Sequence, residues 1–186
     1  MSLGVPVAQS TVNPGSLGIE NTNIETAPGV DLSVQQKILV GSILDLLAGR
    51  PSLKKLQLWA DDATFADPLT NAQGRKQYEA QWYSLETAFS EIERLHQSVT
   101  SAGNPITMDV KTRYKIKGIG KDQIIDSVVQ IYTDDMGEGI VRVENRWNNE
   151  LPHGAFSKIW RNLNSMVIPA FVHVPKNDAE DSKPRN

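Results

Sequence analysis

The sequence predicts one α+β domain in which N-terminal helices cover the concave face of a curved, cone-shaped antiparallel sheet. Helical periods come first along the chain and long strands follow, an order typical of α+β domains rather than parallel doubly wound ones. The clearest strand, at 105–117, alternates apolar with mostly charged residues, which indicates a sheet with one buried and one solvated face. A length of 186 residues gives room for one domain with a substantial core and tails.

Helices are expected in the first half of the chain, at 34–48, 52–60 and 74–89. In each segment the apolar residues recur near the helical period of 3.6 residues, so each helix has an apolar face to bury. The apolar stripe of the first helix consists of Val34, Ile38, Ile43, Leu46 and Leu47. The face of the third helix consists of Tyr78, Trp82, Leu85 and Phe89.

Strands dominate the second half. A short strand at 63–68 ends at Pro68, which has no N–H to donate to a sheet. Longer strands are expected at 91–101, 105–117, 122–133 and 140–147, separated by glycine-containing turns. A C-terminal amphipathic helix then follows, with its apolar positions at Phe156, Ile159, Trp160, Leu163, Met166 and Val167.

Both ends of the chain have the composition of disordered segments. Residues 1–30 are rich in Gly, Pro, Ser, Thr and Asn and show no apolar period. Residues 177–186 are polar and charged. We therefore expect a disordered arm at 1–30, a single domain at 31–176 and a disordered tail at 177–186.

The totals exclude several chemistries. The net charge of −3 argues against a nucleic-acid partner, because phosphate binding needs a basic surface. The absence of cysteine excludes disulfides and thiol catalysis and favours the cytoplasm. No apolar run is long enough to span a bilayer, so a membrane is not expected as a partner. The scattered positions of His96, His153 and His173 do not predict a metal site, and no phosphate-binding loop or other cofactor motif is present.

Two segments resemble a known superfamily. Residues 58–68, Leu-Trp-Ala-Asp-Asp-Ala-Thr-Phe-Ala-Asp-Pro, resemble the helix-to-strand signature of nuclear-transport-factor-two-like (SnoaL-like) proteins, and 140–147 resembles their closing strand. Residues 143–147, Leu151-Pro152 and 163–165 are similar to a fungal-type subgroup of unassigned function. The resemblance covers about 34–175. It implies a cystatin-like roll with a pocket under the sheet, and a homodimer formed through the outer sheet face.

That superfamily includes polyketide cyclases, steroid isomerases, dehydratases, epoxide hydrolases and adaptors, so the fold alone does not assign a function. The resemblance places Val143 and Asn145 where its acid–base members carry an inward His and Asp. Valine cannot transfer a proton, which lowers the expectation of enolisation or cyclisation chemistry. Asn145 is interpreted either as a ligand-orienting amide or as a core amide with satisfied hydrogen bonds.

Three residues are candidates for acid–base catalysis. Asp67 precedes a proline near the expected pocket mouth, where it is either a turn cap or a carboxylate with a raised pKa. His96 alternates with Ile92 and Arg94 and is either a pocket imidazole or a surface residue. Asp126 is either an inward acid or one half of an ion pair with Arg113 or Lys115 on the neighbouring strand.

Further side chains are candidates for contacting a ligand, because binding pockets are mostly apolar and aromatic with a few polar groups. The alternative for the aromatic members is ordinary core packing. The candidates are Trp59, Phe65, Trp82, Tyr114, Tyr132, Asn145 and Trp147.

Three hypotheses about function follow. The first is a pocket that binds a small apolar molecule. The second is a cofactor-independent lyase, isomerase or cyclase that uses Asp67, His96 or Asp126, with a tyrosine or Asn145 as the oxyanion donor. The third is a protein-interaction module or homodimer that uses the outer sheet face.

Overall fold

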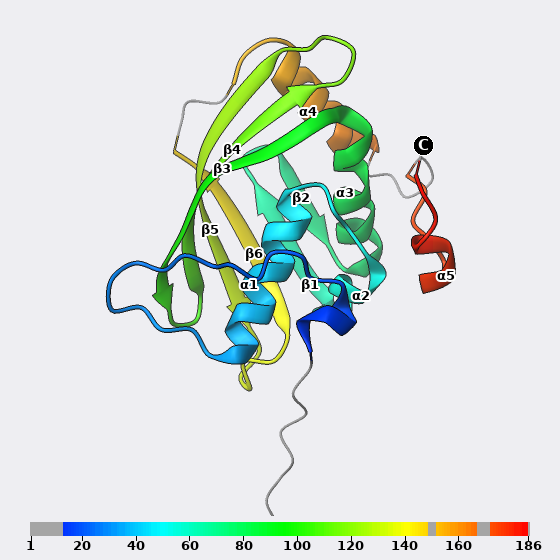
Figure 1. Cartoon of the computed structure of the whole chain (residues 1–186). Coiled ribbons are helices and arrows are strands. Elements are labelled where there is room, and N and C mark those ends of the chain that lie inside the picture. Colours follow the sequence, from blue (N-terminus) through cyan, green and yellow to red (C-terminus); the bar gives the residue numbers. More distant parts are fainter. Residues whose placement is uncertain (1–12, 149–151, 167–171, 186) are drawn as a thin grey trace, which may run out of the picture.

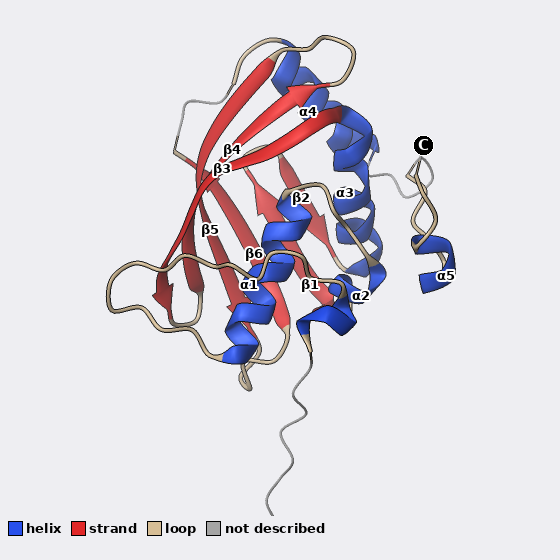
Figure 2. Cartoon of the chain, viewed as in Figure 1, coloured by secondary structure: helices blue, strands red, loops and turns tan. Residues whose placement is uncertain are grey.

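The computed structural model describes residues 13–148, 152–166 and 172–185, and a curved six-stranded sheet forms its centre (Figures 1 and 2). The strands lie in the order β2-β1-β6-β5-β4-β3. Their bounds are β1 Trp59–Asp67, β2 Thr70–Gln73, β3 Phe89–Ala102, β4 Ile106–Ile116, β5 Asp122–Thr133 and β6 Ile140–Trp147.

Most of the sheet is antiparallel, as the sequence predicted, and one pair of strands is parallel. The meander β3-β4-β5-β6 is antiparallel throughout, as is the pair β1-β2. Strand β1 pairs with β6 in parallel, with Phe65 opposite Val143. A hairpin cannot join parallel neighbours, and here the connection from β1 to β6 is long and includes a helix.

Helix α1 (Val34–Leu47) lies on the concave side of the sheet (Figure 1). The hydroxyl of Ser33 accepts the N–H of Gln36, and this bond caps the helix. Every residue from Ile38 to Leu47 is buried. The sequence predicted a one-sided apolar stripe that included Val34, but this side chain is 65% exposed. A helix buried all round needs cover on two sides, and here the sheet provides one of them.

The N-terminal arm provides the other cover, and it crosses α1 in Figure 1. The carboxylate of Asp45, in α1, accepts the backbone N–H groups of Glu20 at 2.9 Å and Asn21 at 3.1 Å. Gly41 lets the arm approach, because a Cβ there would lie 2.5 Å from the carbonyl oxygen of Asn21. Residues 13–30 are therefore held in place, which corrects the expectation of disorder for this part of the arm. Residues 1–12 lie outside the described range.

The C-terminal segment also packs on the body. It contains helix α5 (Asp178–Asp181), which lies beside α2 (Leu53–Leu56) and α3 (Arg75–Ala88). The carboxylate of Asp181 accepts the N–H of Leu53 at 2.8 Å and the hydroxyl of Tyr83 at 2.7 Å. The composition predicted a disordered tail at 177–186, but these bonds order its described part, 177–185.

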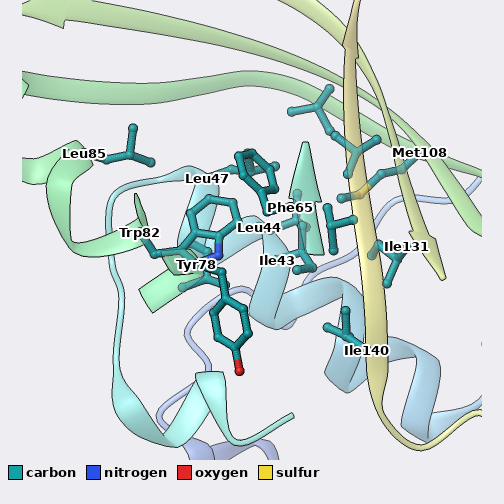
Figure 3. Close-up of a cluster of buried hydrophobic side chains, with 14 of the residues drawn as sticks. Ile43, Leu44, Leu47, Phe65, Tyr78, Trp82, Leu85, Met108, Ile131 and Ile140 are labelled. Carbon is teal, nitrogen blue, oxygen red and sulfur yellow. The ribbon is translucent and has the colours of Figure 1, made fainter. Parts of the chain in front are cut away.

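The core lies between the sheet and the helices. Figure 3 shows side chains of α1, α3 and the sheet converging in one cluster. The remaining helix, α4 (Ala155–Met166), lies against α3 and β2 and closes one end of the curved sheet (Figure 1). The buried faces of α4 and of the sheet meet around a set of aromatic rings.

Candidate functional site

Five aromatic rings lie between α4 and the sheet and form the α4 aromatic cluster, which consists of Phe89, Tyr114, Trp147, Phe156 and Trp160. The centroids of contacting rings are 5.1 to 6.2 Å apart. Phe156 and Trp160 are one helical turn apart, so α4 presents both to the sheet. The cluster is closed in this structure because its own rings fill it.

Asp67 connects the sheet to this cluster. It is the last residue of β1, and its Oδ1 accepts the N–H of Leu69 at 2.8 Å, which is a turn cap. Its Oδ2 accepts the indole N–H of Trp160 at 3.2 Å. The sequence left open whether Asp67 is a turn cap or a pocket carboxylate. The geometry combines a turn cap on one oxygen with a contact to the aromatic cluster on the other.

The surroundings of Asp67 change its acidity. Burial raises the pKa of Asp67 from 3.8 to about 6, against hydrogen bonds from Leu69, Thr70 and Trp160 that lower it. Burial also raises the pKa of the Tyr114 hydroxyl, and the nearby charge of Asp67 raises it further. A carboxyl group that titrates near pH 6, beside a tyrosine that stays protonated, can hold and release a proton near neutral pH.

Several buried polar atoms lack a hydrogen-bond partner among the described residues, and Oδ1 of Asn145 and Nε1 of Trp147 are two of them. Both residues lie on the inward face of β6, as the alternation predicted, opposite Val129 and Ser127 of β5. In the parallel pairing of β1 with β6, Asn145 follows the partner of Ala66 and therefore lies beside Asp67. Buried polar atoms are normally paired, so each of these two atoms has the capacity to bond to a further group.

Three predicted ligand contacts lie in a different cluster. Trp59, Phe65 and Trp82 pack with Tyr78 between β1 and α3 and form the α3 aromatic cluster. All four residues are buried, with exposed fractions of 2% or less. Figure 3 shows Phe65, Tyr78 and Trp82 among aliphatic side chains of α1 and the sheet. The alternative of core packing describes this cluster better than ligand contact does.

His96 is exposed on the outer face of the sheet, so it does not share a site with Asp67. The sequence left open whether His96 is a pocket imidazole on the face of Ile92 and Arg94 or a surface residue, and the structure shows the surface residue. Ile92 and Arg94 do pair with inward positions of β4, but the register shifts between Arg94 and His96. His96 therefore lies opposite Lys111, an outward residue. A shift of one residue moves every later side chain to the other face.

Asp126 and Tyr132 also lie on the outer face. The buried positions of β5 are Ile125, Ser127, Val129 and Ile131, which is the opposite set from the one that contains Asp126. Asp126 forms an ion pair with Lys111 at 3.5 Å, which is the paired alternative with a partner other than the expected Arg113 or Lys115. The guanidinium of Arg142 lies 5.2 Å from the ring centroid of Tyr132. The structure therefore does not bring Asp126 and Tyr132 together with Asp67.

The sequence analysis missed Trp160, Phe89 and Phe156 as members of the site. Trp160 and Phe156 were assigned only to the apolar face of a helix. The available signal was a tryptophan on that face, because its indole N–H needs a partner when it is buried.

The described residues contain neither a cluster of side chains that could hold a metal ion nor a helix that could span a membrane. In residues 13–148, 152–166 and 172–185, no group of three or more His, Cys, Asp or Glu side chains is arranged to hold a metal ion. None of the helices in the same ranges is long and apolar enough to cross a membrane.

Comparisons with known proteins identify the fold. No family model and no curated protein sequence matches the chain. Among solved structures, a steroid delta-isomerase from Pseudomonas aeruginosa superimposes with a TM-score of 0.54 at 16% identity, covering 77% of this chain and 98% of that one. A proposed SnoaL-like polyketide cyclase from Shewanella denitrificans gives a TM-score of 0.50 at 17% identity, covering 62% and 90%. A nuclear-transport-factor-two-like protein of unknown function from Exiguobacterium gives 0.49 at 17% identity, covering 60% and 99%.

The chain therefore has the SnoaL-like fold, as the resemblance of its motifs implied. Sequence identities below 20% with these solved structures show a shared fold and do not show a shared activity. The assignment to a fungal-type subgroup stays a prediction.

Proposed function

We propose that the protein binds a small apolar molecule between α4 and the sheet, with Asp67 as its polar anchor. The observation that carries the proposal is the composition of the α4 aromatic cluster. One of its five rings, that of Trp160, donates a hydrogen bond to the Asp67 carboxylate, and Oδ1 of Asn145 and Nε1 of Trp147 have no partner among the described residues. Small-molecule sites are typically aromatic enclosures of this kind, with a few polar groups that orient the ligand.

The ligand would take the place of rings from α4. Phe156 and Trp160 bury their apolar surface in the cluster, and Trp160 also donates to Asp67. An apolar ligand would bury its own apolar surface while the displaced rings lose theirs, so the free energies of the two burials nearly cancel. The ligand would also break the hydrogen bond from the indole of Trp160 to the Asp67 carboxylate, which is worth about 1–3 kcal/mol. A ligand that bonds to Asp67 recovers that contribution.

Native mass spectrometry of the protein purified from its own host tests the proposal. We expect a mass above that of the bare chain, and a small apolar compound in the organic extract. The Asp67→Asn variant should retain less of the compound, whereas Asp126→Asn, a matched change on the outer face, should retain as much as the wild type. A bare chain in every preparation, or equal loss in both variants, would contradict binding at Asp67.

Acid–base catalysis is a second candidate, and the Asp67–Tyr114 pair favours it. A pKa of about 6 makes the Asp67 carboxylate a competent base at neutral pH. Tyr114 remains a hydroxyl donor suited to stabilising an oxyanion. A cyclic ketone incubated with the protein in D2O should take up deuterium next to its carbonyl. The uptake should be lost in Asp67→Asn and kept in Asp126→Asn, and no uptake above the buffer rate would reject catalysis of this type.

Two further expectations belong to the proposal. The outer face presents Arg142, Glu144 and Arg146 in one row, and we propose that a homodimer forms through it. Light scattering that gives the mass of one chain at high concentration would contradict the dimer.

We also propose a cytoplasmic location, on the absence of cysteine, and fractionation of the host cell tests it.

A further inference from the structure

Asp67 is a partly buried carboxylate with no cation beside it among the described residues, and in this it differs from three other acids of low exposure. Three acidic side chains that are at most 10% exposed each have a basic partner: Asp45 with Lys55 at 3.1 Å, Glu144 with Arg146 at 2.6 Å and Asp181 with Arg185 at 2.9 Å. Within the described part of the chain, no Lys, Arg or His forms an ion pair with Asp67. Its partners are the N–H groups of Leu69 and Trp160 and the residue Thr70. Buried charges are normally paired, so Asp67 has the environment of an acid whose counter-ion comes from outside.

The walls around Asp67 suit an organic cation. Trp160 contacts Tyr114 and Trp147, with centroid distances of 5.5 and 5.6 Å, and it also contacts Asp67 directly. Aromatic faces attract alkylammonium groups, most strongly where water is excluded. A hard metal ion instead needs several oxygen ligands, and one carboxylate among aromatic rings does not supply them.

We infer that the ligand carries an alkylammonium group, with its charge on Asp67 and its alkyl groups against Trp147 and Tyr114. This inference rests on the proposed function, because it names the chemical class of the molecule bound there. The cation replaces the indole N–H of Trp160 as the partner of Oδ2. It converts a carboxylate that burial disfavours into one half of a buried ion pair, which explains how a ligand competes with α4 for the cluster.

Two probes of equal shape test the inference. Choline has a quaternary nitrogen where 3,3-dimethyl-1-butanol has a carbon, so the two differ mainly in charge. Each is titrated into wild-type protein at pH 7.5 and low salt by isothermal calorimetry, and the indole N–H signals are followed by NMR. We expect choline to bind about tenfold or more tightly than the alcohol, with shifts at Trp147 and Trp160.

The variants separate this inference from the proposed function. Asp67→Asn should remove the preference for choline and leave the affinity for the alcohol, whereas Asp126→Asn should behave as the wild type. If the alcohol binds as tightly as choline, the inference is wrong and the apolar site stands. If neither binds, the inference is also wrong. The proposed function then fails as well if native mass spectrometry finds a bare chain.

Discussion

The indole Nε1 of Trp160 donates a hydrogen bond to Oδ2 of Asp67 at 3.2 Å, which joins α4 to the last residue of the first strand. The two residues are 93 positions apart, so this bond is a tertiary link and not a local one. In the proposed function a ligand breaks this link on entering the site.

Removing the donor should loosen α4. We expect Trp160→Phe to lower the free energy of unfolding by about 1 kcal/mol more than Trp82→Phe does. Both changes remove the same atoms from a buried indole, but the N–H of Trp82 has no acceptor among the described residues. Urea denaturation of the two variants gives the comparison. Equal losses would mean that the bond to Asp67 contributes nothing to stability.

The acidity of Asp67 predicts a specific pH dependence. Its pKa is raised from 3.8 to about 6 by burial, so between these values the folded state holds the proton more tightly than the unfolded chain. The contribution of Asp67 to stability therefore falls as pH rises through this window and is constant above it. We expect Asp67→Asn, which has no charge, to gain about 1–3 kcal/mol relative to wild type between pH 4 and 7.

Urea denaturation of wild type and Asp67→Asn between pH 4 and 7 measures the difference in their free energies of unfolding. Taking the difference cancels the titration of the other acids, which both proteins share. A relative stability of Asp67→Asn that declines with rising pH would show that the folded state favours the charged form. That result would contradict the assigned environment of Asp67.

The arm should detach when Gly41 is enlarged. A Cβ at this position would lie 2.5 Å from the carbonyl oxygen of Asn21 and 2.9 Å from a methyl carbon of Ile19. We expect Gly41→Ala to lose about 1–3 kcal/mol, although alanine favours the helix by about 1 kcal/mol. Limited proteolysis should then cut the arm near residues 19–30 faster than in wild type. Gly103→Ala is the control, since its Cβ would meet nothing closer than 3.4 Å, and equal cleavage of the two variants would rule out the contact.

Asp181 should hold the C-terminal segment. Besides Leu53 and Tyr83, its carboxylate pairs with Arg185 at 2.9 Å. We expect Asp181→Ala to lower the free energy of unfolding by about 2–4 kcal/mol, because it leaves buried donors without an acceptor. Asp178→Ala, an exposed change on the same helix, should cost much less. Thermal unfolding of both variants measures this, and equal small losses would mean that α5 is not anchored through Asp181.

Regular periodicity made most of the fold predictable from the sequence. The alternation in β4 and β6 gave their inward faces correctly, and Asp67 became a candidate because a proline follows it. Strand β2 was missed because its four residues, Thr70–Gln73, show no apolar alternation long enough to recognise.

The site was only partly predictable, since its partners are distant in sequence. Local alternation cannot reveal a register shift, so it could not decide between the pocket and surface alternatives for His96. Both faces of β5 carry apolar residues, so alternation did not fix the side of Asp126. The meeting of Trp160 with Asp67 depends on the packing of α4, which no local pattern encodes.

The central claim is that a small molecule occupies the α4 aromatic cluster next to Asp67. The most direct measurement is the indole N–H spectrum of 15N-labelled protein from its own host, recorded before and after organic extraction. The account predicts that extraction shifts the signals of Trp147 and Trp160 and leaves those of Trp59 and Trp82 in place. Four unchanged signals, or shifts confined to Trp59 and Trp82, would contradict it.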